Sequence, residues 1–310
     1  MPFTTNASGV YVIAATPFHS DGRIDHDSAD RLTDFYLESG ASGLTVLGVM
    51  GEAPKLDADE SVALVRRVVR RAGKTPVVVG VTSPGFAPMR ALARNAMEAG
   101  AAGVMIAPPA TLRSDDQVVS YFAQAREAIG EDVPFAVQDY PLAFSVVMTP
   151  QVLGRIVADN ASCVMLKIED WPSLEKISTL RALQREGRMR RVSILTGNGG
   201  IFVDFELERG ADGAMTGYAF PDMLTELVAL SAAGERDRAH DLFDAHLPLM
   251  RYEQQPGVGL AVRKYLLHKR GVIASQAQRK PATALSDAAR AEVDYLLARL
   301  ARRDGRACCI

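Results

Sequence analysis

The chain alternates short apolar segments with amphipathic ones, and this alternation is the feature that most restricts its fold. Stretches of about 12 to 20 residues with apolar positions near a 3.6-residue spacing predict helices between the apolar segments. Segments that are apolar along their whole length are typical of strands in a parallel sheet covered on both faces. Eight such strands are expected, at 10–15, 43–48, 76–81, 103–108, 134–139, 163–168, 192–197 and 213–217.

Eight strand–helix units predict an α/β fold of the (β/α)8 TIM barrel type. A doubly wound sheet is the alternative, but it usually has a glycine-rich nucleotide turn after its first strand. The sequence at that point is AATPFHSDG. Three turns also share a pattern, ESGASG, EAGAAG and ERGADG, in which one glycine ends a helix and a second allows a strand to pack closely. These features favour the barrel.

The C-terminal part of the chain contains helical patterns only, with apolar residues at i, i+3 and i+4. No low-complexity linker precedes it. We therefore predict two parts, a barrel over residues 1–234 and a C-terminal helical extension over residues 235–310 that packs on the barrel.

Composition and charge exclude several classes of function. The 35 Lys and Arg residues nearly balance the 37 Asp and Glu residues, so no global field favours nucleic acid or an anionic membrane. No apolar run of about eighteen residues predicts a membrane span. The five histidines form no metal-binding motif, so neither a metal nor another cofactor is expected.

The N-terminus lacks the features of a signal peptide, and a reducing cytoplasm is the expected location. Cys163 lies in an apolar segment and is interpreted as a core residue. Cys308 and Cys309 are adjacent in the C-terminal tail and cannot close a stabilising loop.

Lys167 is the residue that most directly suggests chemistry. It lies near the end of the apolar segment CVMLKI, and the C-terminal ends of barrel strands face the active site. Apolar neighbours would favour the neutral amine, which can attack a carbonyl to form a Schiff base. The alternative is a structural lysine that reaches solvent or pairs with Glu169 or Asp170.

The chain resembles the Schiff-base aldolases and lyases of the dihydrodipicolinate synthase and N-acetylneuraminate lyase family. The motifs that carry the resemblance are ATPF at 15–18, GVMGE at 48–52, DYP at 139–141, LKIED at 166–170, TGNGG at 196–200 and RGADGAMTG at 209–217. The resemblance implies a barrel, a homotetramer or homodimer, and Lys167 as the amine that condenses with pyruvate or another 2-oxo acid, with an aldehyde as a second substrate in some members.

The chain departs from the family pattern after the second strand. Members usually have two hydroxyl residues where this sequence has Val49 and Met50. The backbone N–H groups of this glycine-flanked turn can still bind a carboxylate, so Val49 and Met50 remain predicted substrate-binding residues.

A second departure concerns proton transfer. The family's tyrosine at the end of the fifth strand is replaced by Gln138, whose amide cannot shuttle protons. Tyr140 lies two residues later and either supplies a phenol from a shifted position or merely packs. Glu169 lies two residues after Lys167 and either relays protons or pairs with the lysine.

The loop after the seventh strand completes the predicted site. Gly197 and Asn198 offer an amide and bare N–H groups to a polar substrate, or form only a tight turn. Two further family residues have no counterparts here. One is the tyrosine after the fourth strand that a neighbouring subunit contributes, and the other is the arginine that holds the carboxylate of the aldehyde substrate in the synthase. True dihydrodipicolinate synthase activity is therefore not expected.

The sequence therefore predicts a Schiff-base lyase, aldolase or dehydratase, with catalytic Lys167, Tyr140 and Glu169 and with Gln138 among the substrate-binding residues. A catalytically degenerate barrel that binds a small metabolite in a regulatory role is the alternative. A pyridoxal phosphate enzyme is disfavoured because no phosphate-binding loop is evident.

Overall fold

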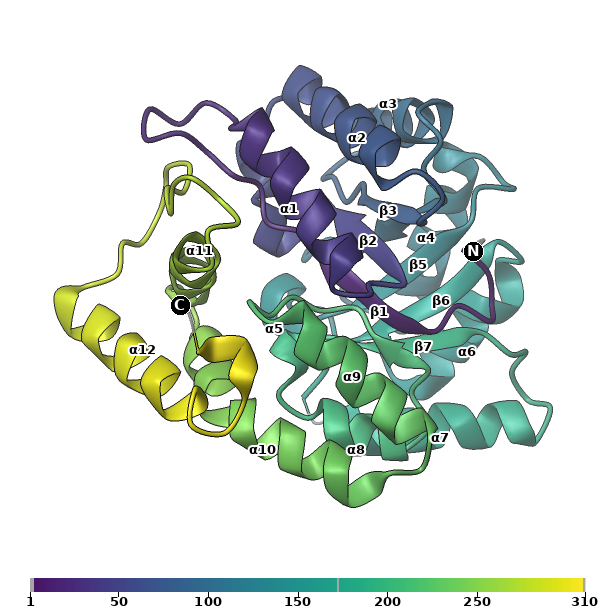
Figure 1. Ribbon diagram of the computed structural model, residues 1–310. Helices are drawn as coiled ribbons and strands as arrows, with labels where there is room; N and C mark the ends of the chain where they lie inside the picture. The colour runs from purple at the N-terminus through teal and green to yellow at the C-terminus, as the bar shows by residue number, and fades with distance from the viewer. Residues whose placement is uncertain (1–2, 172, 309) are drawn as a thin grey trace.

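Eight parallel strands form a closed barrel in the computed structural model, which describes residues 3–171, 173–308 and 310 (Figure 1). Each strand pairs with the next, and β8 pairs with β1. The predicted (β/α)8 architecture is confirmed. The strands are β1 (Gly9–Ile13), β2 (Gly43–Val46), β3 (Val77–Gly80), β4 (Gly103–Ile106), β5 (Phe135–Asp139), β6 (Cys163–Ile168), β7 (Ser193–Thr196) and β8 (Gly213–Ala214).

Helices cover the outside of the barrel, and several begin at strong capping residues. Asp57 and Glu60 form a capping box at the start of α2, as do Ser114 and Gln117 at the start of α4. The helices are α1 (His26–Glu38), α2 (Ala58–Ala72), α3 (Phe86–Glu98), α4 (Asp115–Ile129), α5 (Pro141–Phe144), α6 (Pro150–Asp159), α7 (Ser173–Arg185), α8 (Val203–Glu208) and α9 (Pro221–Ala232). Short 3₁₀ helices are η1 (Val49–Gly51), η2 (Ala53–Lys55), η3 (Asn198–Gly200) and η4 (Gly305–Ala307).

The described part of the protein has two clusters of buried apolar side chains. The larger one lies between the strands and the helices, and the smaller one fills the barrel interior. Its buried members are Phe3, Ala7, Tyr11, Ile13, Val78, Met105, Ala136, Met165, Leu195 and Met215. Side chains alternate between the two faces of a strand, so a residue two positions after an interior residue also points inward. Gln138 and Lys167 are such residues, near the C-terminal ends of β5 and β6, and Gly197 follows the last residue of β7.

The repeated turns have the conformations that their glycines predict. Gly40 ends its helix at φ +81°, in the left-handed region that glycine adopts without strain. Gly103 begins a strand so close to its neighbours that an added Cβ would lie 2.5 Å from the Phe3 ring and from the Pro134 carbonyl. The buried sulfur of Cys163 agrees with its interpretation as a core residue, whereas Cys309 lies outside the described residues.

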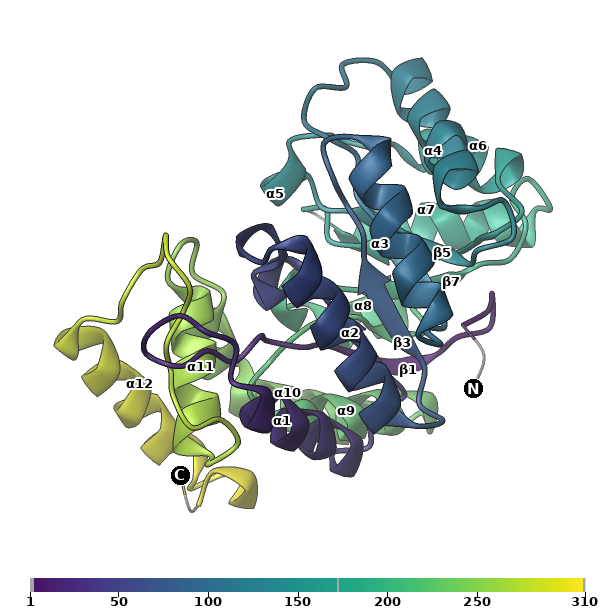
Figure 2. The same cartoon turned by 90° about the horizontal axis from the view of Figure 1, so that it is seen from above.

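Three further helices follow the barrel: α10 (Arg236–Glu253), α11 (Gly259–Lys269) and α12 (Asp287–Leu300). In both cartoon views α11 and α12 lie on the opposite side of the molecule from α4 and α6 (Figures 1 and 2). A buried ion pair joins α11 to the barrel loop after β2, with Lys264 Nζ 2.5 Å from Glu52 Oε1. The C-terminal helices therefore reach the end of the barrel where the strands terminate.

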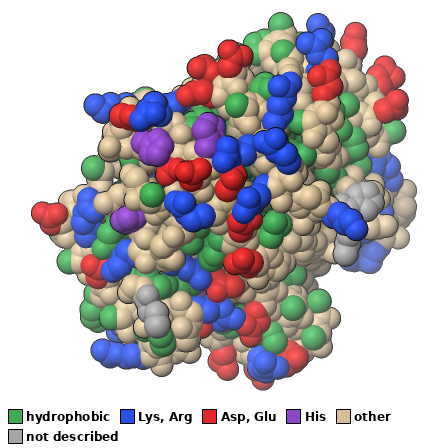
Figure 3. Space-filling view, turned by 45° about the horizontal axis from the view of Figure 1, so that its top comes forward, with side chains coloured by type: hydrophobic (Ala, Val, Ile, Leu, Met, Phe, Trp, Pro, Cys, Tyr) green, Lys and Arg blue, Asp and Glu red, His purple; other side chains and the backbone are tan. Residues whose placement is uncertain are grey.

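Basic and acidic side chains are interspersed over the face drawn in Figure 3. Arg67 and Arg71 of α2, in the basic stretch RRVVRR at 66–71, pair with Asp30 and Asp34 of α1 at 2.7 and 2.5 Å. Within the described residues, no helix is both long and apolar enough to cross a membrane.

Candidate active site

Lys167 lies in β6 and points into the barrel near its C-terminal end. Only 3% of the residue is exposed. Its Nζ lies 3.0 Å from Oε2 of Glu169, which is 5% exposed. The lysine is thus both desolvated and paired with a carboxylate. This combination of burial and pairing gives the amine a proton acceptor within hydrogen-bond distance.

The Glu169 carboxylate is held in place by two amide donors. Gln138 Nε2 donates to Oε2 at 2.7 Å, and the backbone N–H of Asn198 donates to Oε1 at 3.2 Å. An added Cβ on Gly197 would lie 2.3 Å from Glu169 Cγ, so a glycine is required there to make room for the carboxylate. Five predicted site residues, Lys167, Glu169, Gln138, Gly197 and Asn198, are therefore brought together.

Tyr140 follows β5 and is half-buried beside this group. Its ring packs edge-on against Phe144, with the ring centroids 6.5 Å apart. Burial raises the pKa of the Tyr140 phenol, and the charge of Glu169 raises it further, while a hydrogen bond with Gln254 acts in the opposite direction. The Tyr140 phenol therefore lies close enough to Glu169 for the carboxylate charge to raise its pKa.

The turn after β2 presents backbone donors instead of side chains. Gly51 N–H donates to Gly48 O, and Glu52 N–H donates to Val49 O, at 3.0 and 3.1 Å. Among the described residues, the Val49 and Met50 N–H groups have no hydrogen-bond acceptor. The Val49 side chain is 45% exposed, while Met50 packs on the interior cluster. Val49 and Met50 are not hydrogen-bonded to the Lys167 group.

A second layer of buried charge lies behind β5 and β6. Lys176 of α7 contacts Asp139 Oδ2 at 2.7 Å and also pairs with Asp170. Burial raises the pKa of Asp139 to about 7 despite its contact with Lys176. Asp139 therefore pairs with a buried lysine of α7 behind the site.

Another buried carboxyl, Glu206 of α8, lies behind β7. It accepts a hydrogen bond from the Ser173 hydroxyl, and burial raises its pKa to about 7. Hydrogen bonding with the Ser173 and Thr196 hydroxyls lowers this pKa and partly offsets the effect of burial. The part of the barrel wall around β5, β6 and β7 is thus unusually rich in buried polar groups.

The C-terminal helices supply site residues that were not predicted from the sequence. Gln254 Nε2 donates to Asn198 Oδ1 at 2.9 Å, and the buried Arg263 pairs with Glu253 at 2.5 Å. Lys264, paired with Glu52, has a pKa lowered to about 8 by burial. The signal that could have identified these residues is the Arg263–Lys264 pair within the otherwise apolar segment GLAVRKYLL.

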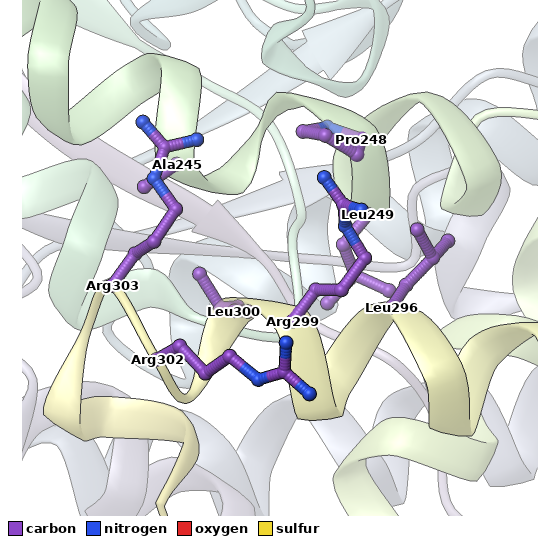
Figure 4. Close-up of a pocket in the computed structure, with 8 residues that line it drawn as sticks. All are labelled: Ala245, Pro248, Leu249, Leu296, Arg299, Leu300, Arg302 and Arg303. Atoms are coloured by element: carbon purple, nitrogen blue, oxygen red, sulfur yellow. The ribbon is translucent and has the colours of Figure 1, made fainter.

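A separate cavity of about 210 Å³ lies between α10 and α12 (Figure 4). Its floor is apolar, and Arg299 and Arg303 extend from the end of α12 towards α10. It shares no residue with the Lys167 group. No cluster of His, Cys, Asp and Glu residues suited to a metal ion occurs in the described part of the chain.

A model of the dihydrodipicolinate synthetase family matches residues 6–300. The chain belongs to this family. Members are lyases, and the prediction of a lyase from this family is confirmed. The chain is 31% identical over 302 residues to an L-2-keto-3-deoxyarabonate dehydratase of Azospirillum brasilense, covering 96% of both chains. It is 28% identical to a 4-hydroxy-tetrahydrodipicolinate synthase of Chlorobium luteolum, covering 94% of this chain and 96% of the relative.

Solved structures agree with the family assignment. A crystal structure described as dihydrodipicolinate synthase from Rhodopseudomonas palustris superposes with a TM-score of 0.94 at 66% identity, covering 96% of this chain and 98% of that one. A monomeric dihydrodipicolinate synthase variant superposes with a TM-score of 0.86 at 26% identity, covering 96% and 97%. Since a family relative exists as a monomer, the predicted homotetramer or homodimer stays a prediction.

Proposed function

We propose that this protein is a lyase that forms a Schiff base between Lys167 and a 2-oxo acid. The observation that carries the proposal is the buried Lys167–Glu169 pair at 3.0 Å, with the carboxylate oriented by Gln138 and Asn198. A structural ion pair alone would not need to point into the mouth of the barrel.

The first step would be attack of the neutral Lys167 amine on the C2 carbonyl. Glu169 would accept the proton that the lysine loses and return a proton to the carbinolamine oxygen, which leaves as water. The N–H groups of Val49 and Met50 would bind the carboxylate of the acid. The resulting imine withdraws electrons from C3.

The second step would break a bond next to the imine. In a dehydratase, Glu169 would remove a proton from C3 and give it to the C4 hydroxyl, which leaves as water. In an aldolase, Glu169 would instead remove the proton of the C4 hydroxyl, the C3–C4 bond would break to release an aldehyde, and C3 would then take up that proton. Hydrolysis of the imine then restores the lysine and the carbonyl. Gln138 would position the Glu169 carboxylate. Tyr140 is the alternative proton carrier.

Similarity to a deoxysugar acid dehydratase supports the dehydratase branch over synthesis of dihydrodipicolinate. Gln138 stands where the resemblance implies a tyrosine, and the segment after Tyr140 contains no arginine. In a synthase, such an arginine would hold the aldehyde substrate. Glu169 would take over proton transfer, which explains why an amide is tolerated at position 138.

The test is borohydride reduction of the protein with pyruvate and with longer 2-oxo acids, followed by peptide mass spectrometry. Lys167→Ala should abolish the adduct, whereas Lys176→Ala, which removes the other buried lysine near the site, should retain it if the fold survives. Circular dichroism establishes that the variants are folded.

An adduct on the peptide that contains Lys167 would support the lyase. Absence of an adduct with every 2-oxo acid, in a folded protein, would contradict it and favour a metabolite-binding barrel without catalytic activity.

A further inference from the structure

Two glycines at the mouth of the barrel leave space that is filled by polar side chains from the C-terminal helices. A Cβ on Gly199, in the loop after β7, would lie 2.1 Å from Gln254 Oε1. A Cβ on Gly217, just after β8, would lie 2.0 Å from Arg263 Nη1. Gln254 and Arg263 therefore occupy positions where the barrel's own loops supply no side chain.

The Arg263 guanidinium lies on the inner side of the barrel mouth. Met215 belongs to the interior cluster, and Thr216 continues the β8 pairing by accepting a hydrogen bond from Ile13 N–H at 2.9 Å. Because side chains alternate along an extended strand, position 217 faces inward as position 215 does. The guanidinium covers that inward face of Gly217.

Arg263 is held rigidly but keeps one donor group unused. Its Nε pairs with Glu253 Oε1 at 2.5 Å, and its Nη2 donates to the Gly217 carbonyl. Its Nη1 is buried and has no hydrogen-bond partner among the described residues. A buried donor without a partner is costly and rare, and it calls for an explanation such as an ordered water or a role in binding.

We propose that Arg263 Nη1 and the Gln254 amide form a subsite for the hydroxylated tail of the 2-oxo acid, on the β7–β8 side of the mouth. This inference rests on the proposed function. The tail means the carbon atoms beyond C3, and it can reach the β7–β8 side only if the carboxylate binds at the β2 turn and C2 is bound to Lys167. The substrate class is a 2-oxo-3-deoxy acid with hydroxyl groups beyond C3.

The charges around Arg263 favour a neutral hydroxyl over a second carboxylate. The positive charge of Arg263 is already balanced by Glu253, and both side chains are 3% exposed. The buried Glu169 carboxylate is likewise already balanced, by Lys167 at 3.0 Å. A second carboxylate on the substrate would enter this group without a compensating cation, whereas a hydroxyl accepts a hydrogen bond without adding charge.

The experiment compares two probes that differ in their tails, 2-oxobutanoate and 4,5-dihydroxy-2-oxopentanoate. The half-saturating concentration of each is measured by borohydride trapping on Lys167. The variant is Arg263→Met combined with Glu253→Gln, which removes both charges together and leaves no buried charge without a partner. The control is Arg270→Met with Asp222→Asn, which removes an ion pair between the end of α11 and α9, with atoms 3.3 Å apart.

The parent protein should bind the dihydroxy acid more tightly than 2-oxobutanoate. In the Arg263→Met/Glu253→Gln variant this preference should fall by about 10- to 100-fold, because a hydrogen bond from a charged donor is lost. Trapping of 2-oxobutanoate should be unchanged, and the control should keep the preference. Gln254→Leu should reduce the preference by a smaller factor.

If parent and variant prefer the dihydroxy acid over 2-oxobutanoate equally, the proposed subsite is wrong. Arg263 would then be a structural residue whose Nη1 binds at most a water molecule. A failure of both probes to form any adduct in the parent protein would instead contradict the Schiff base itself. The two failures are therefore distinguishable.

Discussion

The two sides of the barrel mouth present different chemistry to a ligand. The turn after β2 offers backbone N–H groups flanked by the apolar side chains of Val49 and Met50. The opposite side, from β5 to β8, presents buried polar side chains, including Gln138, Glu169 and Asn198. Binding of a simple carboxylate needs only oriented donors, whereas proton transfer and substrate selection need side chains. We infer that specificity and catalysis reside on the β5–β8 side.

The sharpest test of this difference is Glu169→Gln. The amide keeps a similar shape but cannot carry a proton, so we expect turnover to fall by about 10²- to 10⁴-fold. The variant should still give some borohydride adduct because Lys167 is intact. The matched control is Glu175→Gln, which changes an exposed glutamate of α7 that pairs with Arg209 at 2.7 Å. Wild-type turnover in Glu169→Gln would assign the proton to Tyr140 or to water.

The buried acids behind the β5–β8 side should make its stability depend on pH. Burial raises the pKa of Glu206 from 4.5 to about 7, so the folded protein holds its proton more tightly than the unfolded chain does. Stability is therefore fully retained below pH 4.5 and decreases as pH rises towards 7, by up to about 3 kcal/mol. In urea denaturation measured at pH 5 and pH 8, Glu206→Gln should remove the part of the decrease due to Glu206 and leave the part due to Asp139, whose pKa is also raised to about 7.

Glu208→Gln provides a control of opposite sign on the same helix. Hydrogen bonds from Arg236 and His240 lower the pKa of Glu208 to about 2, so its contribution is lost as pH falls rather than as it rises. If Glu206→Gln leaves the slope between pH 5 and pH 8 unchanged, then Glu206 is not the group responsible.

The fit of Glu169 against the β7 loop leads to a third prediction. Gly197→Ala would place a Cβ 2.3 Å from Glu169 Cγ and displace the carboxylate from Lys167. A misplacement of about 1 Å can reduce turnover by about 100-fold. Gly154→Ala, in α6, meets nothing within 4 Å and should leave turnover unchanged. Equal activity in the two variants would indicate that the loop adjusts freely.

The smallest effect is expected on the β2 side. Val49→Thr combined with Met50→Ser would add two hydroxyls to a turn that already has two unused N–H groups. We expect the half-saturating concentration of pyruvate in the trapping assay to fall by about 2- to 10-fold, the effect of one or two ordinary hydrogen bonds. A much larger gain would indicate that the backbone donors do not bind carboxylate.

The sequence was sufficient to predict the barrel because each strand and helix carries its own periodic pattern. Alternation along a strand also predicted that Lys167 and Glu169 point to the same side, and their side chains lie 3.0 Å apart. The sequence could not show that Gln138 and Asn198 hold the same carboxylate, because this depends on the register between β5, β6 and β7.

The charged Arg263–Lys264 pair stands out in an apolar segment, but sequence patterns could not show what Gln254 and Arg263 contact. Neither residue belongs to a motif, and each is separated from its partner at the barrel mouth by about 46 to 56 residues of chain. Only the packing of α10 and α11 against the barrel brings them to Gly199 and Gly217. Long-range contacts of this kind depend on how whole helices dock, which local periodicity does not encode.

The position of Gln254 and Arg263 late in the chain also affects the order in which the protein becomes functional during synthesis. A ribosome completes all eight strands, and with them Lys167 and Glu169, before it makes α11. Until then Glu52 lacks its partner Lys264, and the spaces at Gly199 and Gly217 are unfilled. A nascent chain would thus possess the residues proposed for Schiff-base chemistry before those proposed to select the substrate, and on this proposal selectivity would be the last property that the growing chain acquires.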